Sequence, residues 1–167
     1  MNTSNPATAT VRPPMGRATT VLLAISVVFY LVAMFTAPFR TGAPDPHPWA
    51  DGWQVLLTGW MGLFFGIFAW LANPLVFAAW WLIAKRRRTQ ALALAVLALL
   101  FGLSFLTQHR IVVNEAGGVE PVHLDAIGYW CWLAGFGMAA IGAALLPGRT
   151  GTRAAGLFGR PPTTSPP

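Results

Sequence analysis

Three histidines are the residues of this chain best suited to metal chemistry. His47, His109 and His123 all lie in two loops between strongly apolar segments, and Asp125 follows His123 at a spacing of two. A site of imidazole and carboxylate ligands forms only if the two loops meet. Because neither loop has the helical spacing that fixes such ligands on one face, a metal-dependent enzyme on the outer side of a membrane is the weakest of three hypotheses. We expect no resident cofactor.

Asn73 is the second candidate, because it is strongly polar and lies well inside an apolar segment, next to Pro74. Pro74 cannot donate a hydrogen bond to the carbonyl of Trp70, which predicts a break in a helix. Freed carbonyls at such a break can line a cavity, where Trp70, Asn73 and Pro74 would contact a small uncharged or lipid-like molecule. Alternatively, the Asn73 amide binds the backbone groups that Pro74 leaves unpaired, or a neighbouring helix.

Other kinds of chemistry have little support in the sequence. The apolar segments contain no charged residue, which weighs against a proton-coupled carrier. Cys131 is the single cysteine, so an internal disulfide and paired-thiol redox chemistry are excluded. Ser26 and Ser104 have no neighbouring acid or base in the sequence, and the Gly-x-Ser-x-Gly motif of many hydrolases is absent. The sequence therefore favours a protein that is not an enzyme.

The elements that must position these residues are membrane helices. Of the 167 residues, 55% are hydrophobic and 10% are charged, against about 25% charged in soluble domains. Each of four uncharged segments reaches the roughly 20 residues that cross a hydrocarbon core, and in lipid the backbone must satisfy its own hydrogen bonds. We predict an all-α integral membrane bundle with helices at about 18–37, 53–84 broken at 73–74, 89–107 and 126–147. Whether residues 74–84 continue the second helix or form a separate segment stays open.

The charges orient this predicted bundle. All five acidic residues share one side of it with Arg40 and Arg110, and every other basic residue falls on the opposite side. By the positive-inside rule, both ends of the chain are cytoplasmic. Residues 1–16 and 148–167 are predicted to be disordered cytoplasmic tails. The net charge of +6 is thus a signal of topology and of contact with membrane lipids, and we expect no nucleic-acid partner.

Small residues recur at helical spacing in the second and fourth segments. Such stripes let two helices approach closely, so we predict that these two helices meet through them. A bundle with glycine faces and no buried charge supports the leading hypothesis, a non-enzymatic scaffold or partner-binding subunit. It would associate with itself or with another membrane protein. The glycines concerned are Gly59, Gly62, Gly66, Gly128, Gly135 and Gly142.

The outer loop at 108–125 has two runs of β-branched residues around a turn at 115–118. This pattern predicts a short hairpin on the outer face. Pro121 restricts the second run, because proline is tolerated only where one side of a strand is unpaired.

The segment from Gly59-Trp60 to Ala69-Trp70-Leu71-Ala72-Asn73-Pro74, followed by Gly128-Tyr129-Trp130, resembles small bacterial four-helix inner-membrane proteins of unknown function. The resemblance covers about residues 50–147. It implies a multi-pass protein of the bacterial cytoplasmic membrane and assigns no activity.

Overall fold

We describe a computed structural model that covers residues 15–42, 51–112 and 118–147. His47 and the predicted tails, apart from Met15 and Gly16, lie outside the described residues. The fold is mostly helical. The α-helices are α1 (Arg17–Met34), α2 (Gly52–Thr58), α3 (Ala72–Ala84), α4 (Arg88–Ser104) and α5 (Ile127–Ala144). The 3₁₀ helices are η1 (Gly59–Phe65), η2 (Phe68–Leu71) and η3 (Phe105–Thr107), and the strands are β1 (Arg40–Thr41), β2 (Arg110–Val112) and β3 (Val119–His123).

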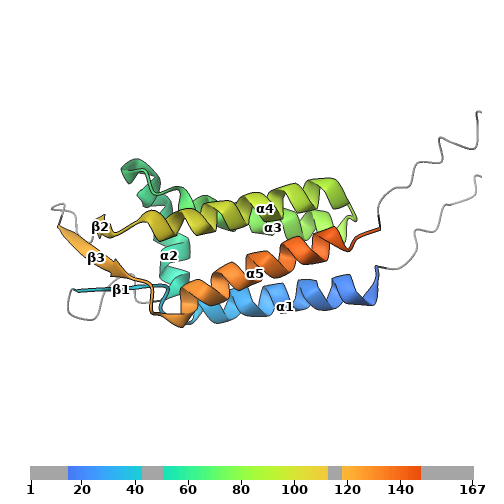
Figure 1. Cartoon of the computed structure of the whole chain (residues 1–167), viewed down its shortest axis with the longest axis horizontal. Helices are drawn as coiled ribbons and strands as arrows, with labels where there is room; N and C mark the ends of the chain where they lie inside the picture. The colour runs from blue at the N-terminus through green and yellow to red at the C-terminus, as the bar shows by residue number, and fades with distance from the viewer. Residues whose placement is uncertain (1–14, 43–50, 113–117, 148–167) are drawn as a thin grey trace, which may run out of the picture.

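Four of the helices run along the long axis of the molecule, and α2 lies across them near the end that carries the strands (Figure 1). Three segments are long and apolar enough to cross a membrane, namely Arg17–Met34, Arg88–Thr107 and Ile127–Ala144. The chain is therefore that of a membrane protein, as its composition predicts. A further apolar helical segment, Phe68–Ala84, is shorter.

The second apolar segment is divided differently from the prediction. A single helix over 53–84 with a break at Asn73-Pro74 is wrong, because the irregular part spans Gly59–Leu71. Pro74 lies in the first turn of α3, where its missing N–H would have no partner within the helix in any case. Residues 74–84 thus belong to a helix of their own that begins at Ala72.

Gly66 provides the reversal between η1 and η2. Its φ is 77°, a left-handed conformation that glycine adopts without steric cost. The turn is closed by hydrogen bonds from Ile67 N–H to the Gly62 carbonyl, at 2.9 Å, and from Gly66 N–H to the Leu63 carbonyl, at 3.2 Å. The chain therefore turns back on itself here, before α3 starts.

The glycine face of α5 packs on α1 and not on the second segment. A Cβ at Gly128 would overlap the carbonyl oxygen of Ala37, and one at Gly135 would lie 3.1 Å from the carbonyl oxygen of Ser26. The predicted pairing of the second and fourth helices is therefore wrong. The physical reason is that most glycines of the second segment lie in η1 and the turn after it, and so do not form a helix face. The helix that follows, α3, packs chiefly on α4.

A three-stranded sheet, in the order β1-β3-β2, extends from one end of the bundle. The predicted pairing of the two β-branched runs is confirmed, since β2 pairs antiparallel with β3 and Val112 lies opposite Val119, whereas residues 115–117 of the predicted turn lie outside the described residues. β1 was not predicted, and this strand of two residues pairs with Val122 and His123 of β3. Pro121 accordingly has a strand partner on one side alone, as proline requires.

In the turn between α3 and α4, the backbone of one residue that is not glycine has a positive φ. Arg86 has a φ of 57°, although it follows α3 at the position where helices usually carry glycine. Hydrogen bonds from Arg86 N–H to the Ile83 carbonyl and from Arg87 N–H to the Leu82 carbonyl, both 2.9 Å, hold it there.

Replacing Arg86 by Gly should raise the free energy of unfolding by about 1 kcal/mol, because a left-handed conformation costs a non-glycine residue about that much. Reversible unfolding in mixed detergent micelles measures it. Arg87→Gly is the matched control, since it removes the same charge from a residue whose φ is −95°. A gain equal in both variants would show that charge, and not strain, is responsible.

Candidate functional site

A cavity of about 640 Å³ lies at the end of the bundle nearest the sheet. Its walls come from the end of α1, from α2, η1 and η2, from β2 and from the start of α5. Most of the lining side chains are aliphatic or aromatic, and among the described residues none of them carries a charge. The side chains that bring a polar group to its wall are Thr58, Trp70, Asn73, Tyr129 and Trp132.

Asn73 joins three helices at this cavity. Its side chain is 5% exposed. The Oδ1 atom accepts hydrogen bonds from the Tyr30 hydroxyl at 2.9 Å and from the Trp132 indole N–H at 3.0 Å. The Nδ2 atom donates to the Trp70 carbonyl at 3.1 Å. The alternative considered for Asn73, in which its amide binds local backbone or a neighbouring helix, is thus present in the structure, since Trp70 precedes α3 and the other two partners lie on α1 and α5.

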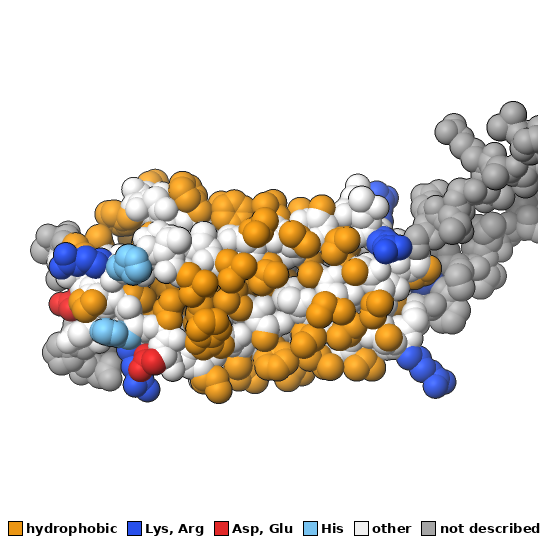
Figure 2. All heavy atoms as spheres, in the orientation of Figure 1, with side chains coloured by type: hydrophobic (Ala, Val, Ile, Leu, Met, Phe, Trp, Pro, Cys, Tyr) orange, Lys and Arg blue, Asp and Glu red, His pale blue; other side chains and the backbone are white. Residues whose placement is uncertain are grey.

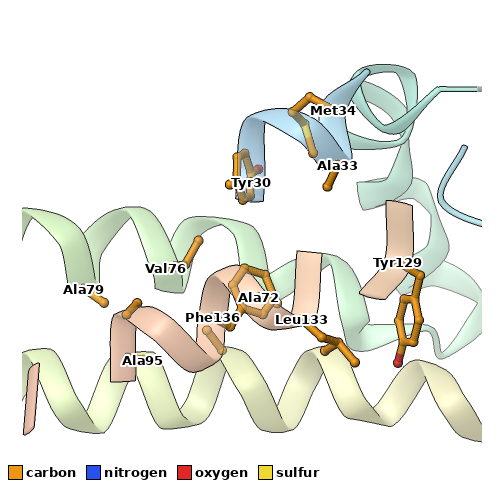
Figure 3. Close-up of a cluster of buried hydrophobic side chains, with 12 residues drawn as sticks. Tyr30, Ala33, Met34, Ala72, Val76, Ala79, Ala95, Tyr129, Leu133 and Phe136 are labelled. Carbon is orange, nitrogen blue, oxygen red and sulfur yellow. The ribbon is translucent and has the colours of Figure 1, made fainter. Parts of the chain in front are cut away.

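The aromatic residues around Asn73 are fixed by the packed core beneath the cavity. Figure 3 shows Tyr30 on α1, Phe136 and Leu133 on α5 and Ala72 on α3 converging there. Tyr129 points away from α1, and its hydroxyl donates to the Gly102 carbonyl of α4 at 3.1 Å. The two tyrosines are therefore each held by packing and by one hydrogen bond to a neighbouring helix.

The roof of the cavity is α2 together with η1 and η2. The indole N–H of Trp70 donates to the Leu56 carbonyl at 2.8 Å, which ties the segment before α3 to α2. The start of α2 is capped by Asp51 and Gln54, which bind each other's backbone N–H groups. A Cβ at Gly59 would lie 2.9 Å from the Trp70 ring, and one at Gly62 would lie 3.3 Å from Cβ of Ile67. These two glycines thus let the roof fold tightly on itself.

A second polar layer lies deeper in the bundle. The Ser26 hydroxyl, which is fully buried, donates to the Gly135 carbonyl at 2.7 Å and accepts from the Trp80 indole at 2.9 Å. Sequence reasoning found no partner for Ser26 and missed Tyr30, Trp80 and Trp132 altogether. Aromatic residues within apolar segments were the available signal, because buried tyrosine and tryptophan usually have a hydrogen-bond partner.

Some of the predicted site residues line the cavity and others do not. Trp70 and Asn73 line the cavity, whereas Pro74 is exposed and does not. Among the glycines, Gly59, Gly62 and Gly128 line it, Gly66 forms the turn, and Gly135 and Gly142 pack on α1.

The alternative metal site has no support in the part of the chain that the structure describes. No three residues of the metal-binding types His, Cys, Asp and Glu gather there. His109 and His123 lie at the sheet, Asp125 makes an exposed ion pair of 3.3 Å with Arg40, and His47 is outside the described residues. We therefore do not propose metal-dependent chemistry.

The chain matches no family model, no curated protein and no solved structure. Its function must therefore be argued from the cavity. The cavity has a large apolar surface and few polar groups, and no acid, base or charged side chain from the described part of the chain lines it. Such a site suits the binding of an uncharged, apolar molecule.

Proposed function

We propose that this chain is a multi-pass membrane protein that binds a small uncharged or lipid-like molecule in the cavity beside Asn73. The cavity carries this proposal. Its volume lies within the range of roughly 300–1,000 Å³ that is typical of small-molecule sites, and its apolar wall with a few fixed polar groups is the usual composition of such sites.

The proposed membrane arrangement is a bundle of four crossings with both ends in the cytoplasm. Besides the three long helices, α3 contributes about 20 Å and η2 about 8 Å, which together approach the roughly 30 Å of a hydrocarbon core. Figure 2 supports this arrangement, since apolar side chains cover the length of the molecule and charged ones gather at its two ends. The charge asymmetry and the stated resemblance favour a bacterial cytoplasmic membrane.

The scaffold hypothesis depends on a glycine surface that is covered within this chain. It required glycine faces that are free to receive a partner helix. Gly135 and Gly142 are covered by α1 of the same chain and Gly128 by the residues that follow α1, and Gly59 and Gly62 contact Trp70 and Ile67. Association with a second membrane protein would have to use other surfaces, so we place ligand binding first.

Filling the cavity tests the proposal. Val55 lines the cavity from α2, whereas Leu57 on the same helix is 64% exposed and does not line it. Val55→Trp should abolish retention of the bound molecule while the helices stay folded, and Leu57→Trp should leave retention unchanged.

Native mass spectrometry of protein released from detergent micelles measures retained molecules as added mass. Wild-type protein without any specific added mass, or equal retention in both variants, would contradict the proposal. Far-ultraviolet circular dichroism checks that both variants keep their helical content.

A further inference from the structure

We propose that the molecule bound in the cavity is an uncharged lipid with a hydrogen-bond-accepting carbonyl oxygen, such as an ester, which enters from the bilayer and binds the free N–H of Asn73. This inference rests on the proposed function and adds to it the chemical class of the ligand and its source.

Most side-chain donors at the cavity wall already have an acceptor within the chain. The indole N–H groups of Trp70 and Trp132 are used by Leu56 and by Asn73, and the hydroxyls of Thr58 and Tyr129 donate to backbone carbonyls. The Asn73 amide has two N–H groups. Within residues 15–42, 51–112 and 118–147, the structure gives a partner, the Trp70 carbonyl, to one of them.

The remaining N–H of Asn73 is thus the side-chain donor at this wall that a ligand can use. A buried donor without a partner costs free energy, so a ligand oxygen that accepts from it binds better than a hydrocarbon of the same shape. The Oδ1 atom already accepts two hydrogen bonds, which is the capacity of a carbonyl oxygen. The site therefore favours an acceptor over a donor in the ligand.

The described wall of the cavity carries no charge. Among residues 15–42, 51–112 and 118–147, no charged residue lines the cavity, and the sequence between Gly52 and Ala84 contains none. A carboxylate or ammonium group would lose its hydration here without gaining a counter-charge. The ligand is accordingly neutral.

The cavity reaches the surface of the molecule at η1. Met61 and Phe65 line the cavity and are also exposed, at 47% and 61%, so they mark its mouth on η1. Three aromatic residues close to it in the sequence, Trp60, Phe64 and Phe68, are exposed as well. A mouth bordered by exposed aromatic side chains faces the region where lipid chains meet the headgroups, and not bulk water. A ligand dissolved in the membrane reaches it directly.

Three probes of equal chain length test the chemical class. Purified wild-type protein in detergent binds radiolabelled methyl oleate in a scintillation proximity assay, and unlabelled methyl oleate, heptadecene or oleate competes. We expect methyl oleate to compete at about tenfold lower concentration than heptadecene, because one additional buried hydrogen bond contributes on the order of 1.4 kcal/mol. Oleate should compete more weakly than the ester.

Each result separates this inference from the proposed function. Equal competition by heptadecene and the ester would overturn the role of the Asn73 donor while leaving a cavity that binds apolar molecules. Competition by oleate as strong as that by the ester would overturn the requirement for a neutral ligand. No saturable binding of any of the three, in protein that is folded, would contradict the proposed function itself.

A pair of variants on η1 tests the mouth. Phe65→Glu places a charge at the mouth, whereas Phe64→Glu places the same charge on the adjacent residue, which is 79% exposed and does not line the cavity. In lipid nanodiscs, Phe65→Glu should slow uptake of methyl oleate at least tenfold and Phe64→Glu less than twofold. Equal slowing in both variants would show that the ligand does not enter beside Phe65.

Discussion

Asn73→Leu should lower the free energy of unfolding by about 3 kcal/mol. Leucine keeps a similar size but leaves the Tyr30 hydroxyl, the Trp132 indole N–H and the Trp70 carbonyl without their partner. A buried group left unsatisfied costs about 1–3 kcal/mol, and measured hydrogen bonds between membrane helices average about 0.6 kcal/mol. Summed over the three groups, these two figures lie on either side of the estimate of about 3 kcal/mol.

A double-mutant cycle with Trp132→Phe shows whether the loss comes from the unsatisfied donors. In the wild type, Trp132→Phe removes a hydrogen bond, whereas in the Asn73→Leu background it removes a donor that has no partner. The two losses should therefore differ by about 1 kcal/mol. Reversible unfolding in mixed micelles measures all four proteins, and strictly additive losses would mean that Asn73 does not join α1, α3 and α5 energetically.

The expected loss of stability makes Asn73→Leu a poor test of ligand binding. A test of ligand binding at this residue requires that the substitution removes binding and leaves folding intact. Because Asn73 bridges three helices, a loss of binding in this variant would not separate the two effects. Val55→Trp and the choice of ligand are the cleaner tests of function.

Gly128→Ala should lower the free energy of unfolding by about 3 kcal/mol, at the upper end of what overpacking usually costs. The added methyl group would overlap the backbone carbonyl of Ala37, and backbone cannot move aside as a flexible side chain can. The hydrogen bond of 3.2 Å from Gly128 N–H to the same carbonyl would be lost with the close approach of the two segments.

Gly137 provides the matched control on the same helix. A Cβ at Gly137 meets nothing within 4 Å, so Gly137→Ala should raise the free energy of unfolding by about 0.5–1 kcal/mol through helix propensity. The opposite signs of the two substitutions, measured in the same unfolding assay, are the prediction. Equal effects would show that the contact between α1 and α5 is looser than described.

The sequence was sufficient to predict the features that depend on composition and on local pattern. Uncharged segments predicted the long membrane helices, and β-branched runs around a turn predicted the pairing of β2 with β3. Both depend on short-range physics, since a segment in lipid must satisfy its own backbone and a hairpin closes over few residues.

The course of the second segment was not predictable in the same way. Pro74 indicated a break at its own position, but proline is well tolerated in a first helical turn and so starts α3 instead. The actual irregular part is set by the turn at Gly66 and by the contact of Trp70 with α2, which joins residues 14 positions apart. Glycine spacing alone does not distinguish a turn from a helix face.

The site was predicted in part. Asn73 and Trp70 were selected because a polar residue beside proline is unusual in an apolar segment, and both line the cavity. Tyr30 and Trp132 could not be assigned to Asn73, because they lie 43 and 59 residues from it and meet it only through helix packing. The cavity itself also depends on α2 lying across the bundle, which no local pattern indicates.

The most direct test of ligand binding is an experimental structure of the protein in crystals grown from a lipidic phase. We expect elongated non-protein density inside the cavity, bordered by Trp70 and Trp132, with an oxygen within hydrogen-bond distance of Asn73 Nδ2. A cavity that holds only ordered water, or one closed by Trp70 and Ile67 moving onto Asn73, would contradict the account.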